Sequence, residues 1–142
     1  MSFWDSSAIV PLCLNEGRSQ FARMLWRRFR VRNVWRESPV EIASAFARRT
    51  REGILDEADR IKAEHRLNIV ETEWNTIKPN ARMVELARTF PAIYGLRALD
   101  SLQLAAALVW CNEFPKDKDF IVADEKLLRA AENMGFTVHD LS

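Results

Sequence analysis

The sequence predicts an α/β protein in which helices cover both faces of a parallel β-sheet. Short apolar runs that suit buried strands alternate with longer segments whose apolar residues recur at helical spacing. The run Phe120–Ala123 is apolar at every position, which is typical of a strand buried on both faces. A chain of 142 residues, 48% of them apolar, matches one compact domain, so we expect residues 1–142 to form a single domain.

The first segments of the chain predict a strand followed by two helices. Phe3–Asp5 is a very short strand, and the apolar run Ser6–Leu14 that follows it suits a short helix. Within Ser19–Phe29, apolar residues that include Phe21 and Met24 recur at helical spacing between arginines. We therefore expect an amphipathic helix with a basic outer face.

A second strand and a capped helix are expected next. Val31–Val34 is the candidate strand. Ser38 then has the position of an N-cap, with Pro39 at the first helical position and Glu41 completing a capping box. The helix that begins here is expected to continue to Gly53.

The middle of the chain is predicted to be mainly helical. Ile54–Arg66 has a helical pattern, whereas Leu67–Lys78 fits helix and strand almost equally, and we predict helix there. Asn80–Phe90 is a further helix. We expect Pro91–Gly95 to break it, because proline removes a backbone donor and glycine favours a helix end.

The last third predicts helix, strand, helix and strand. Asp100–Trp110 is an apolar helix without a polar face, which predicts burial on most sides. The buried strand Phe120–Ala123 follows, and Glu125–Met134 is a helix with Gly135 as its C-cap. Phe136–His139 is the final strand.

Composition and motifs exclude several classes of protein. The longest apolar run, Leu104–Cys111, is far shorter than the roughly 20 residues of a membrane helix, so we expect no membrane association. Cys13 and Cys111 lack zinc-like spacing and are expected to be buried and reduced. The four glycines form no phosphate-binding loop, which excludes a P-loop enzyme. The N-terminus lacks signal-peptide features, so a cytoplasmic location is expected.

The net charge of +1 hides a strongly basic segment. Residues 17–51 contain ten arginines and two glutamates, a local charge of +8. Arginine forks suit phosphate and carboxylate groups, so this segment could face nucleic acid or an acidic protein. The alternative is that the arginines form solvated helix faces.

Four acidic residues are expected at one edge of the sheet. Asp5 and Asp124 follow strands, and Glu41 and Asp100 lie at or near helix starts. In parallel α/β proteins, sites form beyond the carboxyl ends of strands. Because four neighbouring carboxylates repel one another, the cluster predicts a bound cation. Oxygen ligands without His or Cys favour Mg²⁺ or Mn²⁺.

Each of these residues also has a structural explanation. Asp5 and Asp124 are plausible N-caps. Ser38 with Glu41, and Asp100 with Gln103, match the capping box. Capping and metal binding are compatible for an aspartate whose second oxygen is free.

The acidic residues lie in four motifs that together carry a family resemblance. The motifs are Phe3–Val10, Ser38–Ala45, Leu96–Ala107 and Phe120–Ala131, the last followed by Gly135–Phe136. In this order they resemble the motifs of PIN-domain nucleases and, within them, of the VapC-type toxins of toxin–antitoxin pairs. The resemblance covers essentially the whole chain.

The resemblance implies a three-layer α/β/α domain and a metal-dependent endoribonuclease that cuts single-stranded regions of RNA. Asp5 and Asp100 would be the main ligands of Mg²⁺ or Mn²⁺, with Glu41 and Asp124 completing the cluster. Ser6 or Ser7 would orient a carboxylate or a water, and we include Ser7 among the catalytic residues. The sequence departs from the family at Val122, where many members have Ser or Thr.

The resemblance also implies partners: a homodimer and a cognate antitoxin protein. Candidate antitoxin contacts lie between residues 8 and 60 and include Trp26, Phe29 and Trp35, unless these aromatic side chains belong to the core. The basic segment, or Arg97, could instead hold the RNA backbone. A catalytically silent PIN-like domain that binds RNA or protein is the alternative function.

Overall fold

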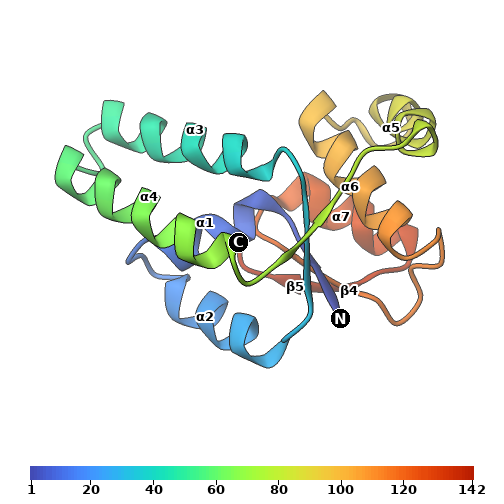
Figure 1. Cartoon of the computed structure of the whole chain (residues 1–142). Helices are drawn as coiled ribbons and strands as arrows, with labels where there is room; N and C mark the ends of the chain where they lie inside the picture. The colour runs from blue at the N-terminus through green and yellow to red at the C-terminus, as the bar shows by residue number, and fades with distance from the viewer.

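The computed structural model describes residues 1–142 and contains one five-stranded, fully parallel sheet (Figure 1). The strand order is β3-β2-β1-β4-β5. The strands are β1 (Ser2–Trp4), β2 (Arg32–Trp35), β3 (Asn75–Ile77), β4 (Asp119–Val122) and β5 (Thr137–Asp140).

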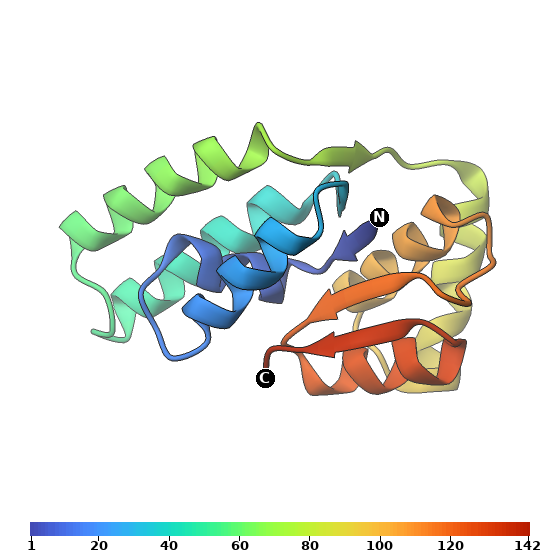
Figure 2. The ribbon, with the colours of Figure 1, turned by 90° about the horizontal axis from the view of Figure 1, so that it is seen from below.

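Seven helices complete the three-layer α/β/α fold that the sequence predicts. They are α1 (Ser6–Cys13), α2 (Ser19–Arg28), α3 (Ser38–Arg51), α4 (Glu57–Glu71), α5 (Ala81–Tyr94), α6 (Ala98–Trp110) and α7 (Glu125–Met134). Helices α1–α4 pack on one face of the sheet and α5–α7 on the other, as Figures 1 and 2 show. No helix is both long and apolar enough to span a membrane.

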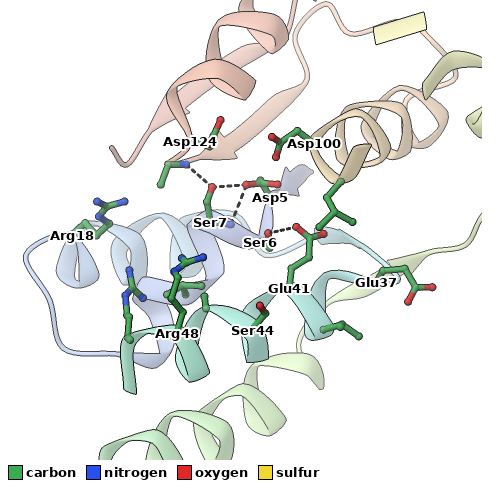
Figure 3. A pocket seen from close by; sticks show the side chains of 16 residues that line it. Asp5, Ser6, Ser7, Arg18, Glu37, Glu41, Ser44, Arg48, Asp100 and Asp124 are labelled. Atoms are coloured by element: carbon green, nitrogen blue, oxygen red, sulfur yellow. Dashed lines mark hydrogen bonds between the residues drawn. The ribbon is translucent and has the colours of Figure 1, made fainter. Parts of the chain in front are cut away.

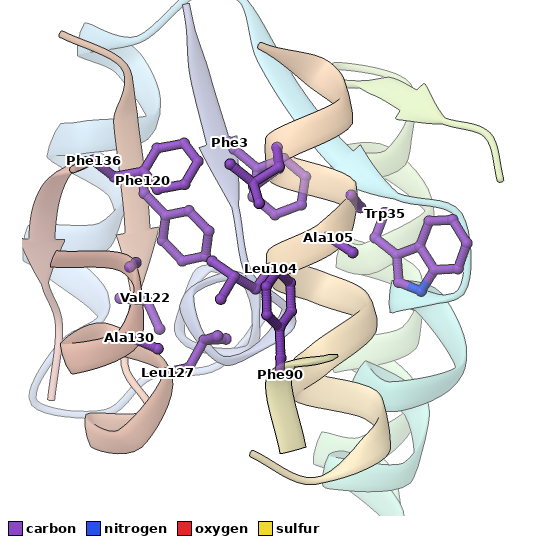
Figure 4. Close-up of a cluster of buried hydrophobic side chains, with 14 of the residues drawn as sticks. Phe3, Trp35, Phe90, Leu104, Ala105, Phe120, Val122, Leu127, Ala130 and Phe136 are labelled. Atoms are coloured by element: carbon purple, nitrogen blue, oxygen red, sulfur yellow. The ribbon is translucent and has the colours of Figure 1, made fainter. Parts of the chain in front are cut away.

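Each face of the sheet has its own apolar core, because successive side chains on a strand point to opposite faces. On β1, Phe3 belongs to the core under α5–α7, and Trp4 to the core under α1–α4. Phe120 of β4 stacks against Phe3 with ring centroids 5.4 Å apart and lies 5.3 Å from Phe136 (Figure 4). Cys13 and Cys111 are buried free thiols, one in each core, as predicted.

The segment Leu67–Lys78 differs from the helical prediction. Helix α4 ends at Glu71, and β3 follows as an edge strand that pairs with β2, with Val34 opposite Thr76. Its side chains are mostly exposed, so the strand lacks the apolar alternation that would distinguish it in the sequence. Pairing with β2, a long-range interaction, decides its conformation.

Pro91 does not break the helix that precedes it. Helix α5 continues to Tyr94 and ends at Gly95, which adopts the left-handed conformation with φ of 65°. Proline removes one backbone donor, but Phe90 and Tyr94, on either side of it, both pack on the apolar core. This packing keeps the last turn helical despite Pro91.

The apolar face of α2 was predicted incorrectly in part. Phe21 and Met24 are 43% and 46% exposed, whereas Ala22, Leu25 and Trp26 are buried. The spacing of the apolar residues alone is compatible with burial of either of these two faces of α2. The buried face carries the large indole of Trp26. This ring packs edge-on against Trp4, with the ring centroids 4.8 Å apart.

Candidate active site

A pocket of about 670 Å³ lies beyond the carboxyl ends of β1 and β4. These strands are parallel neighbours with Trp4 opposite Ile121, and the backbone N–H of Asp5 donates to the carbonyl of Ile121 at 3.0 Å. The pocket is lined by all five predicted site residues, Asp5, Ser7, Glu41, Asp100 and Asp124 (Figure 3). The structure therefore brings together side chains from β1–α1, α3, α6 and β4–α7.

Asp5 is buried at the floor of this arrangement and caps α1. One of its carboxylate oxygens, Oδ2, accepts hydrogen bonds from the backbone N–H of Ser7 at 3.0 Å and from the Ser7 hydroxyl. The other oxygen, Oδ1, is buried without a hydrogen-bond partner. Burial, followed by the negative charges of Glu41 and Asp100, raises the pKa of Asp5 from 3.8 to about 7, although the bonds from Ser7 oppose the rise.

Two adjacent serines hold two different carboxylates. The Ser7 hydroxyl donates to Asp5 and accepts from the backbone N–H of Ala123 at 2.9 Å, so it links α1 to the turn that carries Asp124. The Ser6 hydroxyl donates to Glu41 Oε2 at 3.0 Å. The resemblance left the choice between the serines open, and the structure gives each of them a contact.

Glu41 is held from both sides rather than used in a capping box. Gln103 Nε2 donates to Glu41 Oε1 at 3.0 Å and to the Ser38 hydroxyl at 2.9 Å. The predicted capping box is wrong, because Glu37 is the N-cap and the buried Ser38 hydroxyl serves Gln103 instead. Burial and the charge of Asp100 raise the pKa of Glu41 above its ordinary value.

Asp100 lies in the first turn of α6 and does not cap it. Arg97 is the N-cap, and Gln103, the expected partner of Asp100 in a capping box, points to α3 instead. Burial, followed by the charge of Asp124, raises the pKa of Asp100, while Arg97 and Lys126 oppose the rise. Neither Asp100 nor Glu41 is therefore explained as a helix cap.

Asp124 does cap its helix, as the alternative interpretation predicts. Its Oδ1 accepts from the backbone N–H of Leu127 at 2.9 Å, at the start of α7. Val122, the departure from the family motif, is fully buried in the core under α5–α7. The Ser7 hydroxyl nevertheless reaches the turn just before Asp124 from α1.

The chemical type of the acidic side chains in the pocket suits a hard divalent cation such as Mg²⁺. The four carboxylates of the predicted site offer only oxygen atoms, and three of these carboxyl groups have raised pKa values. Asp5 Oδ1 is in addition a buried oxygen without a hydrogen-bond partner. As the side chains stand, no three acidic, His or Cys residues are grouped closely enough to hold a metal ion. The carboxylate of Asp100 accepts no hydrogen bond, in contrast to the other three carboxylates of the pocket.

Sequence reasoning missed one residue of the site, and the structure decides between the two interpretations of the aromatic side chains. Gln103 was interpreted only as a capping residue, and its position seven residues after Leu96 on an apolar helix gave no signal of its contact with Glu41. Trp26 and Trp35, candidates for antitoxin contact or for the core, are buried in the two cores, which confirms the core alternative. Phe29 is partly buried against the core under α1–α4.

The electrostatic influence of Glu41 on Asp5 can be tested directly. In Glu41→Gln we expect the pKa of Asp5 to fall from about 7, because a neighbouring negative charge that disfavours its ionisation is removed. The measurement is NMR titration of the side-chain carboxyl carbons in the presence of EDTA. Glu37→Gln, four residues earlier on the same rim and paired with Arg36, is the control and should leave Asp5 unchanged. Equal shifts in both variants would show that Glu41 does not face Asp5.

Comparison with solved structures supports the fold at low sequence identity. A chain of a toxin–antitoxin complex from Klebsiella pneumoniae superposes with a TM-score of 0.69 at 14% identity, covering 100% of this chain and 98% of that chain. A protein from Pyrobaculum aerophilum superposes with a TM-score of 0.67 at 16% identity, covering 99% and 88% of the two chains. No protein-family model and no curated protein sequence matches this chain. The protein therefore shares a three-layer α/β/α fold with these two structures over essentially its whole length.

Proposed function

We propose that this protein is a PIN-type, metal-dependent endoribonuclease that hydrolyses phosphodiester bonds in single-stranded regions of RNA. The observation that carries the proposal is the meeting of Asp5, Glu41, Asp100 and Asp124 at one pocket beyond the strand ends. Two of the four have no role as helix caps, and burial of like charges raises the pKa of three of them. An uncompensated cluster of this kind costs stability, which a functional cation would offset.

The four carboxylates would hold Mg²⁺ or Mn²⁺. When bound, the ion supplies positive charge that stabilises the developing charge of the phosphate and promotes ionisation of the attacking water. The residues of the chain orient the carboxylates: Ser7 holds Asp5, while Ser6 and Gln103 hold the two oxygens of Glu41. Asp124 keeps its Oδ1 on the α7 N-terminus, which leaves its second oxygen for the ion or a bound water.

The proposed biological role is that of the toxin in a type II toxin–antitoxin pair. The structure from Klebsiella pneumoniae, described as a toxin–antitoxin complex, supports this role through the shared fold. The partners we propose are single-stranded RNA, a cognate antitoxin protein and a second copy of the chain.

A catalytically silent binding module is the second candidate. It is favoured by the engagement of Asp5 and Asp124 as helix caps and by the spacing of the carboxylates, no three of which are grouped for one ion as they stand. The two candidates differ in whether RNA is cleaved.

The deciding experiment compares the wild type with Asp100→Asn on a pool of structured RNAs, with Mg²⁺, with Mn²⁺ and with EDTA. We expect metal-dependent cleavage by the wild type and a loss of at least about a hundredfold in Asp100→Asn, because a charged group of the metal site is removed. Asp119→Asn, which alters a carboxylate outside the pocket, is the matched control and should retain cleavage. Cleavage that persists in EDTA would refute the metal mechanism, and no cleavage by the folded wild type would favour the binding module.

A further inference from the structure

Basic side chains line two pockets that share carboxylates of the cluster. In the first pocket, which holds all four carboxylates, the basic residues are Arg18 from the start of α2 and two arginines of α3, Arg48 and Arg49. Figure 3 shows Arg18 and Arg48 across the pocket from Asp100. We call Arg18, Arg48 and Arg49 the arginine group.

A second pocket, of about 400 Å³, adjoins the first at Asp100 and Asp124. Asp100 and Asp124 line both pockets, and Arg97 and Lys126 line the second. We call Arg97 and Lys126 the basic pair. The remaining acidic residue of this pocket, Glu125, is paired with Arg129 at 2.6 Å, so the basic pair is balanced locally only by the carboxylates of the site.

The arginine group is incompletely neutralised within the protein. Glu16 is its one acidic neighbour among the ion pairs, 3.8 Å from Arg18 and 3.5 Å from Arg49, and neither contact is a hydrogen bond. Arg49 Nη1 is buried without a hydrogen-bond partner, and Arg48 has no ion pair. The ion pairs therefore set three arginines against one glutamate, and the other acidic residues of the pocket form no ion pair with these arginines. The side chain of Arg18 is 41% exposed and Arg48 is also exposed, so an anionic ligand in the pocket can reach both guanidinium groups.

From this arrangement we infer that a single strand of RNA crosses the site, with phosphates on either side of the reacting one held by the arginine group and by the basic pair. This inference rests on the proposed function and names the substrate contacts that it needs. A polyanion with regularly spaced charges can occupy both basic groups at once, and its central phosphate reaches the carboxylates together with a cation. An acidic peptide is the competing occupant, because carboxylates also pair with arginine, and the binding test below distinguishes it from the oligonucleotide.

The test measures binding separately from cleavage. The probe is a fluorescent 2′-O-methyl oligouridylate of about eight nucleotides, in EDTA, and its binding is followed by anisotropy from about 50 to 200 mM salt. We expect Arg48→Gln/Arg49→Gln, and separately Arg97→Gln/Lys126→Gln, to weaken binding about tenfold or more. Each pair should lower the slope of log affinity against log salt by about 1.4, which corresponds to about 0.7 for each lost phosphate contact.

Arg27→Gln/Arg30→Gln is the matched control, because it removes two exposed arginines that line neither pocket. We expect it to change binding by no more than about twofold. If the control weakens binding as much as the pocket variants do, attraction is general and the inference is wrong. It is also wrong if the pocket variants lose binding to an oligoglutamate peptide but not to the oligonucleotide.

Kinetics distinguish failure of this inference from failure of the proposed function. With an active wild type, Arg48→Gln/Arg49→Gln should raise KM about tenfold and leave kcat within about twofold, because these arginines contact phosphates that do not react. If the wild type cleaves RNA and Arg48→Gln/Arg49→Gln leaves KM and probe binding unchanged, the inferred phosphate contacts are wrong, whereas the proposed function stands. Probe binding that depends on both basic groups, without any cleavage by the wild type, would refute the enzyme and leave the RNA path intact.

Discussion

Asp5→Asn is expected to make the metal-free protein more stable by about 2 kcal/mol near pH 8 while abolishing RNA cleavage. A carboxyl whose pKa rises on folding from 3.8 to about 7 binds its proton more tightly in the native state. Its contribution to the free energy of unfolding therefore falls as the pH rises between these values, by about 4 kcal/mol in all. The substituted asparagine would carry no charge, but its amide would place a buried donor where Asp5 Oδ1 has no partner, at a cost of about 1–3 kcal/mol.

The stability difference between Asp5→Asn and the wild type depends on pH, and this dependence serves as the control. Near pH 5 the native carboxyl is protonated, so the advantage of the variant should disappear. The measurement is urea denaturation in EDTA at about pH 5 and pH 8. A variant that is less stable than the wild type at pH 8 would show that Asp5 is not a strained, buried carboxyl. Addition of Mg²⁺ should stabilise the wild type and leave the variant unchanged, since only the wild type keeps the full ligand set.

Phe120→Ala is expected to lower the free energy of unfolding by about 3–5 kcal/mol, the range for a buried Phe truncated in a packed core. Phe120 is fully buried at the centre of the core under α5–α7, between Phe3 and Phe136 (Figure 4). Its removal leaves a cavity beneath β4, the strand that leads to Asp124. We therefore expect reduced stability without a new chemical defect in the pocket.

Phe114→Ala makes the same chemical change six residues earlier and is the matched control. Phe114 is 75% exposed, so its truncation should change stability by no more than about 0.5 kcal/mol. Chemical denaturation of the two variants and the wild type, with equal m-values, is the measurement. Similar losses in both variants would mean that Phe120 does not lie in the core.

Features decided within a few residues were predicted from the sequence. Asp5 and Asp124 cap α1 and α7 through backbone N–H groups two and three residues away. Gly135 ends α7 with φ of 111°, a conformation that glycine adopts without a steric penalty. The apolar run at β4 identified a strand buried on both faces. The same local signals placed the acidic residues at strand ends and helix starts.

Features that depend on distant partners were predicted incorrectly. The capping box of Ser38 and Glu41 has the right spacing, but both side chains bind Gln103, more than sixty residues away. Strand β3 forms because it pairs with the edge of β2. The last turn of α5 remains helical despite Pro91 because Phe90 and Tyr94 pack on the core. In each case the local preference is worth about 1 kcal/mol or a few, and tertiary contacts outweigh it.

The sequence by itself therefore determined the fold class, most of the helices and strands, and the four acidic residues that belong to one edge of the sheet. Only the tertiary structure decided what holds each carboxylate, which of them act as caps, and which basic groups share their pockets. The physical reason is the separation along the chain of the residues that interact. Caps and apolar periodicity depend on neighbours along the chain, whereas burial, the raised pKa of Asp5 and the placement of the arginines depend on how α1, α3, α6 and α7 pack around the strand ends.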